Sequence, residues 1–391
     1  MNRFIDHKSI NTLIYLLFFL FIGCEDSKES KEIEVITPVD TTKEEVFPEL
    51  GYDGPYQSGN AYYGRESYIE YHAGNLPIIL SAPHGGRLTP DEINDRTYGT
   101  LVTDDNTYEL TKTIMDSMVV RFGGYPHVIL CKLKRTKLDA NRDSTEAAQE
   151  NRYALRAWQE YHHYIEVAKE KIVNDQGSGL FFDIHGHGKN PDGFYDLRTW
   201  LGYLISSDEL DQSNETLNTN SYQSKSSISS WVDSSSYTFI DVLRGSVSFG
   251  SILDSLGYKS LPSVNDPSPS GMRYFSGGYN TARHGSRNGG VISAIQIELP
   301  KPGIRENQST WSNYSKSINS AINEFVDSDF TALRSAHKMS ETSYKTFEVV
   351  ENRFKLLCDG GYDIESTTLP RQSFPVTYKP NGYVDIVRTS K

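Results

Sequence analysis

The sequence predicts an α/β domain in which a mixed, mostly parallel sheet is flanked by helices. Short apolar runs typical of buried strands alternate along the chain with longer segments of helical periodicity. Polar residues suited to chemistry follow several of these runs, where the carboxyl ends of strands in such folds build binding sites. These observations predict the architecture and also the edge of the sheet at which a site is expected.

The expected elements follow one another from about Tyr68 onward. The apolar run at 76–81 indicates a buried strand that leads into a tight Pro-His-Gly-Gly loop. Further strands are expected at 127–133, 179–184 and 290–299, and helices at 107–122, 147–173 and 310–326. The Ser/Asn-rich stretch 211–236 is expected to form a long surface loop.

The N-terminus has the pattern of an export signal. Two basic residues precede an apolar run over 13–22, which is shorter than the ~20 apolar residues of a spanning helix and ends at Gly23 and Cys24. A small residue before such a cysteine resembles a bacterial lipobox, so we expect a signal peptide over 1–23 and lipidation of Cys24. The alternative is an uncleaved anchor helix. In both cases the globular part is expected in the cell envelope, on the periplasmic or the outer-membrane face.

The length of the chain limits the number of domains, and its net charge limits the kinds of partner that it can bind. The 391 residues can hold one large or two modest domains. A flexible acidic tether is expected over 24–55, a catalytic domain over 56–326 and a C-terminal appendage over 327–391. The net charge of −12 argues against nucleic acid as a partner, because binding to phosphates requires a basic face. Neither Cys131 nor Cys358 indicates a disulfide framework.

Two histidines at matching strand ends are the first candidate ligands of a metal. His84 and His185 each close an apolar run and are followed by glycine, and a neutral imidazole in such a loop can bind a metal ion. The alternative is a pair of hydrogen-bonded loop histidines. A catalytic zinc ion usually takes three protein ligands and one water, and Asp104 or Asp105 can supply the third. Either Asp105 or Asn106 is placed to cap the following helix, and we assign Asp104 as ligand and Asp105 as cap.

An acidic residue within an apolar strand is the candidate general base. Glu298 lies in the run Gln-Ile-Glu-Leu, and a buried carboxylate needs either a partner or a chemical role. Beside a metal-bound water it could act first as general base and then as general acid. A structural salt bridge is the alternative.

Arginine and asparagine side chains are the candidate contacts of a substrate. Asn141 and Arg142 stand side by side, and a guanidinium binds carboxylates in bidentate fashion, although a surface ion pair would also explain Arg142. Arg135 could stabilise a developing oxyanion. Arg283, which follows a Gly-rich loop ahead of the Glu298 strand, is a further candidate contact. That loop has neither the lysine nor the spacing of a P-loop.

Five short motifs together resemble the N-formylglutamate amidohydrolase family, which belongs to the zinc carboxypeptidase-like superfamily. SAPHGG, LDANR, DIHGHG, FSGGYNTARHG and QIEL occur in the family order over about residues 70–325. The resemblance implies a phosphorylase/hydrolase-like sheet, zinc bound by His84 and His185, a catalytic Glu298, and a carboxylate clamp formed by Asn141 and Arg142. Carboxypeptidases carry a glutamate three residues after the first histidine, where this chain has Arg87, so the resemblance implies Asp104 as the third ligand.

The last 65 residues carry a second resemblance. LRSAHKMSETSYKTFE and LPRQSFPVTYKPNGYVDIVR are similar to the latter half of acylneuraminate cytidylyltransferases. The N-terminal half of that fold, with its nucleotide-binding loop, has no counterpart here. We therefore expect no nucleotidyl transfer.

The sequence as a whole predicts a zinc-dependent amidohydrolase that acts on an N-acyl amino acid or a related carboxylate. The expected partners are a small-molecule or short peptide substrate and, through the lipid anchor, a membrane. Two rival hypotheses remain: a zinc carboxypeptidase acting on peptides or cell-wall stems, and a non-catalytic surface-binding lipoprotein.

Overall fold

The computed structural model describes residues 45–327 except residue 288, and the backbone of five further strands between residues 345 and 386. The predicted signal peptide, Cys24 and most of the predicted tether lie outside the described residues, as does most of the C-terminal motif sequence. Within the described part of the chain, no helix is both long enough and apolar enough to cross a membrane.

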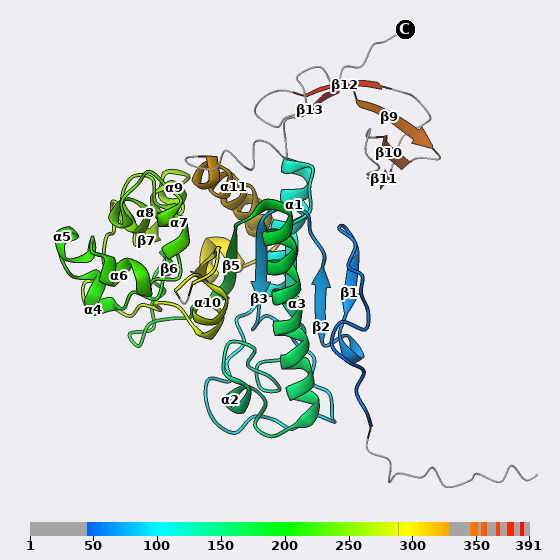
Figure 1. Ribbon diagram of the computed structural model, residues 1–391, viewed down its shortest axis with the longest axis horizontal. Coiled ribbons are helices and arrows are strands. Elements are labelled where there is room, and N and C mark those ends of the chain that lie inside the picture. Colours follow the sequence, from blue (N-terminus) through cyan, green and yellow to red (C-terminus); the bar gives the residue numbers. More distant parts are fainter. Residues whose placement is uncertain are drawn as a thin grey trace, which may run out of the picture. The chain divides into compact units, whose positions relative to one another are not determined.

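The central feature is a mixed eight-stranded sheet in the order β1-β2-β4-β3-β5-β8-β6-β7 (Figure 1). Its strands are β1 Ala61–Tyr63, β2 Ile69–His72, β3 Ile78–Ala82, β4 His127–Cys131, β5 Gly179–Gly186, β6 Thr199–Gly202, β7 Ser260–Leu261 and β8 Ile292–Leu299. The four middle strands β4, β3, β5 and β8 are mutually parallel, whereas β1, β2 and β6 join by antiparallel pairing. The predicted mixed, mostly parallel α/β sheet is therefore confirmed.

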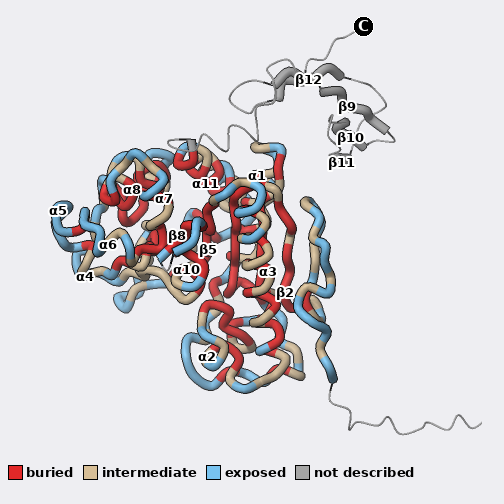
Figure 2. The backbone as a smooth tube through the Cα atoms, viewed as in Figure 1, coloured by how far each residue is buried: buried red, intermediate tan, exposed pale blue. Residues whose placement is uncertain are grey.

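Long helices cover both faces of the sheet. On one face α1 (Thr107–Phe122) and α11 (Gln308–Asp327) pack together, and on the other α3 (Arg152–Gln176) lies along the central strands (Figure 1). The strands between these layers are buried over most of their length (Figure 2). The free thiol of Cys131 lies in this interior.

The two faces of the middle strands differ in polarity. Toward α1 and α11 the side chains are apolar along the whole strand, as in Leu180, Phe182 and Ile184 of β5. Toward α3 the strands begin apolar and become polar at their carboxyl ends, so that in β5 Phe181 is followed by Asp183 and His185. Alternate residues point to opposite faces, so this polar end of one face is the place where a site can form.

The shorter helices correct two sequence-based expectations. The stretch 211–236, expected as a loop, contains three short helices, and the first of them, α5 (Asn214–Leu217), is capped by the side chain of Ser213, which accepts a hydrogen bond from the N–H of Thr216. The helix expected over 147–173 is broken, because Gln149 and Glu150 adopt positive φ angles between α2 and α3. The remaining helices are α2 Ser144–Ala148, α4 Ser207–Leu210, α5 Asn214–Leu217, α6 Asn220–Lys225, α7 Ser229–Asp233, α8 Phe239–Arg244, α9 Phe249–Ser255 and α10 Tyr279–His284, with a 3-10 turn at Arg65–Ser67 and a π turn at Lys301–Arg305.

The C-terminal region forms a second sheet of five antiparallel strands in the order β11-β10-β9-β12-β13. These strands are β9 Lys345–Val350, β10 Arg353–Leu357, β11 Glu365–Thr367, β12 Phe374–Tyr378 and β13 Val384–Ile386. The predicted likeness of this region to a cytidylyltransferase fragment stays a prediction.

Candidate metal centre

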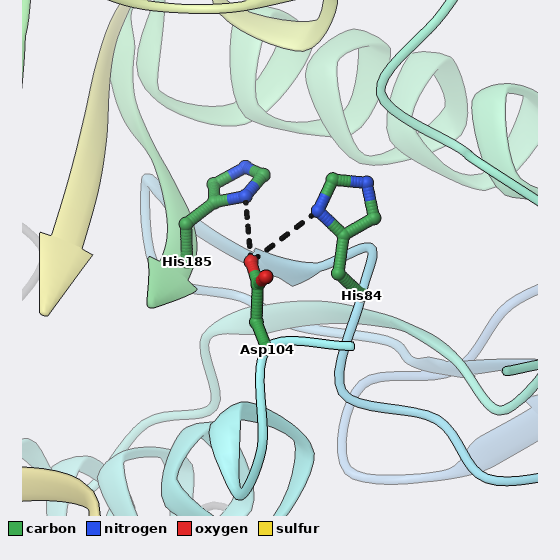
Figure 3. A group of neighbouring side chains, drawn as sticks. All are labelled: His84, Asp104 and His185. Atoms are coloured by element: carbon green, nitrogen blue, oxygen red, sulfur yellow. Dashed lines mark hydrogen bonds and ion pairs between the residues drawn. The ribbon is translucent and has the colours of Figure 1, made fainter. Parts of the chain in front are cut away.

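Three side chains that are distant in the sequence meet at the carboxyl edge of the central sheet. His84 follows β3, Asp104 precedes α1, and His185 lies near the end of β5 (Figure 3). The Nδ1 atoms of His84 and His185 lie 3.3 and 3.2 Å from the same carboxylate oxygen of Asp104. One ligand atom from each residue lies within 4.8 Å of the other two, and all three residues are buried. The geometry brings together the three predicted ligands.

Each imidazole is held from behind by a second buried carboxylate. The Nε2 atom of His84 lies 2.6 Å from Oδ1 of Asp139, and the Nε2 atom of His185 lies 2.8 Å from Oδ2 of Asp183. A carboxylate on the outer nitrogen fixes the tautomer and ring orientation and makes the inner nitrogen a better ligand. Both inner Nδ1 atoms are therefore directed to one point.

The sequence analysis assigned no role to either of these supporting carboxylates. Asp183 lies two residues before His185 and therefore on the same face of β5, so the alternation of the strand was the signal that could have identified it. Asp139 lies in the LDANR motif, but its partner follows a different strand, and no sequence spacing indicates that contact.

Asp104 is positioned by backbone as well as side-chain contacts. Its N–H donates to the carbonyl of His84 at 3.0 Å, and the N–H of Gly186 donates to its Oδ2 at 3.2 Å. Burial alone would raise the pKa of Asp104, but the hydrogen bonds from His185 and His84 hold that pKa well below its usual range. The carboxylate is therefore kept in the ionised form that a metal ion requires.

The neighbouring Asp105 does not cap the helix as predicted. The residue at the cap position of α1 is Asn106, which has a left-handed backbone and makes no side-chain cap bond. The carboxylate of Asp105 instead lies 3.1 Å from Nζ of Lys301. Arg87, at the position where carboxypeptidases carry a glutamate ligand, pairs with Glu109 and Asn106 away from the centre.

Arg305 is a further part of the centre that the sequence analysis missed. Its guanidinium donates to the carbonyls of Leu299, His187 and Asp105, which belong to three different segments around the site. It lies so close to Gly186 that a Cβ atom there would overlap it. Arg305 therefore ties the ends of β5 and β8 to the loop that carries Asp104.

Glu298 lies beside His185 in the sheet. The two are direct partners in the parallel register of β5 and β8, so their side chains emerge on the same face. The side chain of Glu298 is buried and accepts a hydrogen bond of 2.9 Å from Gln296. Burial raises the pKa of Glu298, and the nearby Asp104 carboxylate raises it further, whereas His185 and His84 lower it. An acidic group with a raised pKa is suited to exchange a proton near neutral pH.

Arg135 and Asn141 are both in contact with this cluster. The Arg135 guanidinium lies 3.0 Å from Oδ2 of Asp139 and 3.6 Å from Oδ1 of Asp104. The amide nitrogen of Asn141 lies 3.4 Å from Nε2 of His185, and its carbonyl oxygen accepts a 2.7 Å hydrogen bond from the backbone of Asn280. The described structure thus places Asn141 on the outer side of His185, opposite the nitrogen that faces Asp104.

The other two predicted substrate contacts lie at the periphery. Arg142 pairs with Glu146 at 3.1 Å, and its charge contributes to the lowered pKa of Asp139. Arg283 is exposed and stacks on the ring of Trp158 at 5.0 Å. Because Nε1 of Trp158 donates to the carbonyl of Arg142, the two arginines occupy one neighbourhood.

The donor set fits a catalytic zinc ion. Two imidazole nitrogens and one carboxylate oxygen are ligands that zinc prefers, and three protein ligands leave one position for water. His187, although close in sequence, does not join the set, because its ring stacks on Trp200 at 4.0 Å and its Nε2 lies 3.0 Å from the carbonyl of Arg198. The fold and the centre define an α/β protein with a buried candidate metal site of catalytic type.

Comparisons with known proteins give distant structural matches. No family model matches the chain, and no curated protein matches it in sequence. An N-formylglutamate amidohydrolase from Ralstonia eutropha JMP134 is 12% identical, with a TM-score of 0.42 over 68% of this chain and 99% of its own. The succinylglutamate desuccinylase from Chromobacterium violaceum is 12% identical, with a TM-score of 0.32 over 70% and 71%. The CwlD amidase from Clostridioides difficile, solved with the GerS lipoprotein, is 10% identical, with a TM-score of 0.28 over 64% and 99%. At these identities and scores, none of the three establishes a family or an activity for this chain.

Proposed function

We propose that this protein is a zinc-dependent amidohydrolase that cleaves the amide bond of an N-acyl amino acid or a related carboxylate. One observation carries the proposal: two imidazoles, each backed by its own carboxylate, direct their Nδ1 atoms to a third carboxylate beside a buried glutamate. The five motifs that resemble N-formylglutamate amidohydrolases contain five of these six residues, all except Asp104, which supports the same reaction class.

In this proposal His84, Asp104 and His185 hold the ion. Zinc, when bound, supplies a water of lowered pKa and polarises the amide carbonyl. Asp139 and Asp183 keep the two imidazoles in the orientation and tautomer needed for binding. The protein thus prepares the site through fixed hydrogen bonds.

Glu298 moves the proton in this proposal. Its carboxylate accepts a proton from the attacking water and delivers it to the amide nitrogen as the C–N bond breaks. The hydrogen bond from Gln296 to Oε1 orients the carboxylate and leaves its other oxygen for this role. Arg135, the nearest guanidinium to Asp104, balances the negative charge that collects around the centre as the oxyanion develops.

The carboxylate of the substrate is assigned to the arginines at the periphery. Arg142 and Arg283 provide two guanidinium groups in one neighbourhood, and Asn141 links this neighbourhood to His185. A guanidinium recognises a carboxylate by paired hydrogen bonds, which favours a substrate with a free acid group.

The substitution Glu298→Gln tests the reaction directly. We expect the purified variant to retain about one zinc ion per chain and to lose roughly 10²- to 10⁴-fold in kcat, because the amide cannot accept the proton. Glu70→Gln, a matched substitution of a buried glutamate in β2, should retain activity. Turnover that survives unchanged in Glu298→Gln would exclude this mechanism.

The choice of substrate separates the proposal from its rivals. We expect hydrolysis of N-acyl amino acids and no release of C-terminal residues from peptides. Preferred cleavage of peptides would instead indicate a carboxypeptidase, and metal binding without turnover of either class would indicate a binding protein.

We also propose that the mature chain is lipid-anchored through Cys24 in the cell envelope. This proposal rests on the N-terminal sequence alone. Labelling with palmitate and membrane fractionation should show an anchored protein that becomes unlabelled and soluble in Cys24→Ala. Labelling that persists in Cys24→Ala would contradict the assignment.

A further inference from the structure

Two loops beside the candidate metal centre expose large apolar side chains. Phe194 and Leu197, in the loop between β5 and β6, are 74% and 61% exposed, and Met272, in the loop between β7 and α10, is 50% exposed. We call these three residues the apolar rim. Exposed apolar side chains that gather next to a polar site commonly mark a place where a ligand binds.

A single arginine joins the two loops of the apolar rim. Arg198 follows Leu197 directly, and its Nη2 lies 4.0 Å from the sulfur of Met272. Its guanidinium also pairs with Asp196 at 2.7 Å and with Asp266 at 3.2 Å, so one cation bridges both loops. These contacts tie the two loops of the apolar rim to each other.

The loop that carries Phe194 and Leu197 contacts a residue next to the centre. The carbonyl of Arg198 lies 3.0 Å from Nε2 of His187, which follows the proposed ligand His185 by two residues. The ring of His187 stacks on Trp200, and Trp200 is the partner of Glu298 in the antiparallel register of β6 and β8. The rim therefore lies on the side of the centre that carries the proposed catalytic carboxylate.

The apolar rim is too small and too mixed for a membrane surface. Lys189, Asp192, Asp196 and Arg198 alternate with the two apolar residues of the first loop, so the charge there sums to zero. A chain of net charge −12 also gains nothing from anionic lipid headgroups. Three side chains suffice, however, to cover one flexible hydrocarbon chain.

We propose that the apolar rim binds an apolar acyl group, so that the substrate is an N-acyl amino acid whose acyl chain is several carbons long. This inference rests on the proposed function, since it assigns the acyl half of the same substrate. The arginines at the periphery receive the carboxylate, and the apolar rim receives the hydrocarbon. The protein then prefers amphiphilic substrates over N-formyl or N-acetyl ones.

Calorimetric titration of the full chain tests the inference without requiring turnover. N-acetyl-, N-hexanoyl- and N-decanoylglycine are titrated into zinc-loaded Glu298→Gln protein. Complete burial of one methylene is worth about fourfold in affinity, and a solvent-exposed rim provides about half of the free energy. At about twofold for each of the four added methylenes, we expect the Kd to fall roughly 15-fold from N-acetyl- to N-hexanoylglycine.

Two variants locate this dependence on chain length. Phe194→Ser combined with Leu197→Ser should remove it, whereas Val120→Ser, which alters a residue of α1 that is 79% exposed, should leave it intact. A Kd that is independent of acyl length, or a length dependence that survives the double substitution, would overturn the inference. Binding of the wild-type rim to phosphatidylcholine vesicles in place of N-acylglycines would also overturn it. If length-dependent binding is observed and the wild-type protein hydrolyses none of the three compounds, the hydrolase proposal fails and the acyl site stands.

Discussion

The described residues contain two contacting pairs of buried histidines, and the two pairs are built differently. In the candidate centre, His84 and His185 do not bond to each other; both direct Nδ1 to Asp104, and each Nε2 ends on a carboxylate of its own. In the second pair, Nδ1 of His162 in α3 lies 2.8 Å from Nε2 of His284 in α10. In the second pair, the two nitrogen atoms that face each other are therefore hydrogen-bonded to each other and are not available to a metal ion.

A carboxylate also supports the second pair, but it contacts only one of the two histidines, His284. Nδ1 of His284 lies 2.9 Å from Glu166, and the rings of His162 and His284 stack 5.1 Å apart. Such an arrangement joins two helices and leaves no group of nitrogen atoms facing a common point. Histidine content and burial alone thus do not distinguish a metal centre from a structural pair; the direction of the nitrogen atoms does.

Removal of one histidine from each pair should give the largest contrast. We expect His84→Ala to weaken zinc binding by about a thousandfold or more, because one of three protein ligands is lost. His284→Ala should leave zinc binding within about threefold of the wild type. Metal content after gel filtration and competition with a fluorescent zinc chelator would measure both. Equal loss in the two variants would contradict the distinction.

Removal of a supporting carboxylate should also affect zinc binding when the carboxylate belongs to the first pair and not when it belongs to the second, with a smaller effect than removal of a histidine. Asp139→Asn keeps the shape of the side chain but weakens its hold on His84, and such changes typically cost 10- to 100-fold in metal affinity. The matched substitution Glu166→Gln, next to His284, should not change the affinity for zinc. Thermal unfolding of both variants serves as the control for folding, and an unchanged zinc affinity in Asp139→Asn would argue against the centre.

The second pair should reveal itself through stability at acid pH. Burial lowers the pKa of His284 to about 4 from 6.5, although Glu166 opposes this shift and the charges of Lys169 and Arg283 reinforce it. Between these values the unfolded chain binds a proton that the native chain does not, so stability falls as the pH falls below 6.5. Urea unfolding in EDTA measures the free energy of unfolding at pH 7 and at pH 5. Between these pH values the wild type should lose roughly 1–2 kcal/mol more of this free energy than His284→Gln does. An identical loss of unfolding free energy in the wild type and in His284→Gln would show that the native protein does not hold His284 in its neutral form.

The central strands were predictable because they are buried on both faces. β3, β5 and β8 appear in the sequence as unbroken apolar runs, and the predicted ranges lie within a few residues of the observed ones. The short outer strands β1, β2, β6 and β7 were not predicted. β2, with the sequence Ile-Glu-Tyr-His, has no strong pattern, and β7 comprises two residues. Strands β2, β6 and β7 run opposite to the four middle strands. Their direction depends on the path by which the chain returns to the sheet, and no local sequence pattern predicts that path.

The candidate ligands were predictable from their place after the strands, but their supporting contacts were not. His84, Asp104 and His185 come together as expected from strand ends that meet at one edge of the sheet. Arg305 and Asp139 act through bonds to backbone or side chains more than 50 residues away, and such pairings depend on the finished fold. The division of roles between Asp104 and Asp105 depended on the cap of α1, where Asn106 took the position expected for Asp105.

The pairing of β5 with β8 has a consequence for engineering. His185 and Glu298 are neighbours because eight consecutive residues of two parallel strands are in register, from Gly179 with Ile292 to Gly186 with Leu299. A slip of one residue would turn Glu298 to the opposite side of the sheet. The pairing of His185 with Glu298 is thus set by the main-chain hydrogen bonds of the sheet, and neither Phe194 nor Met272 lies in the two paired strands. Replacement of the loop segments that carry Phe194 and Met272 should therefore change which compounds the proposed site accepts and leave the pairing of His185 with Glu298 unaltered.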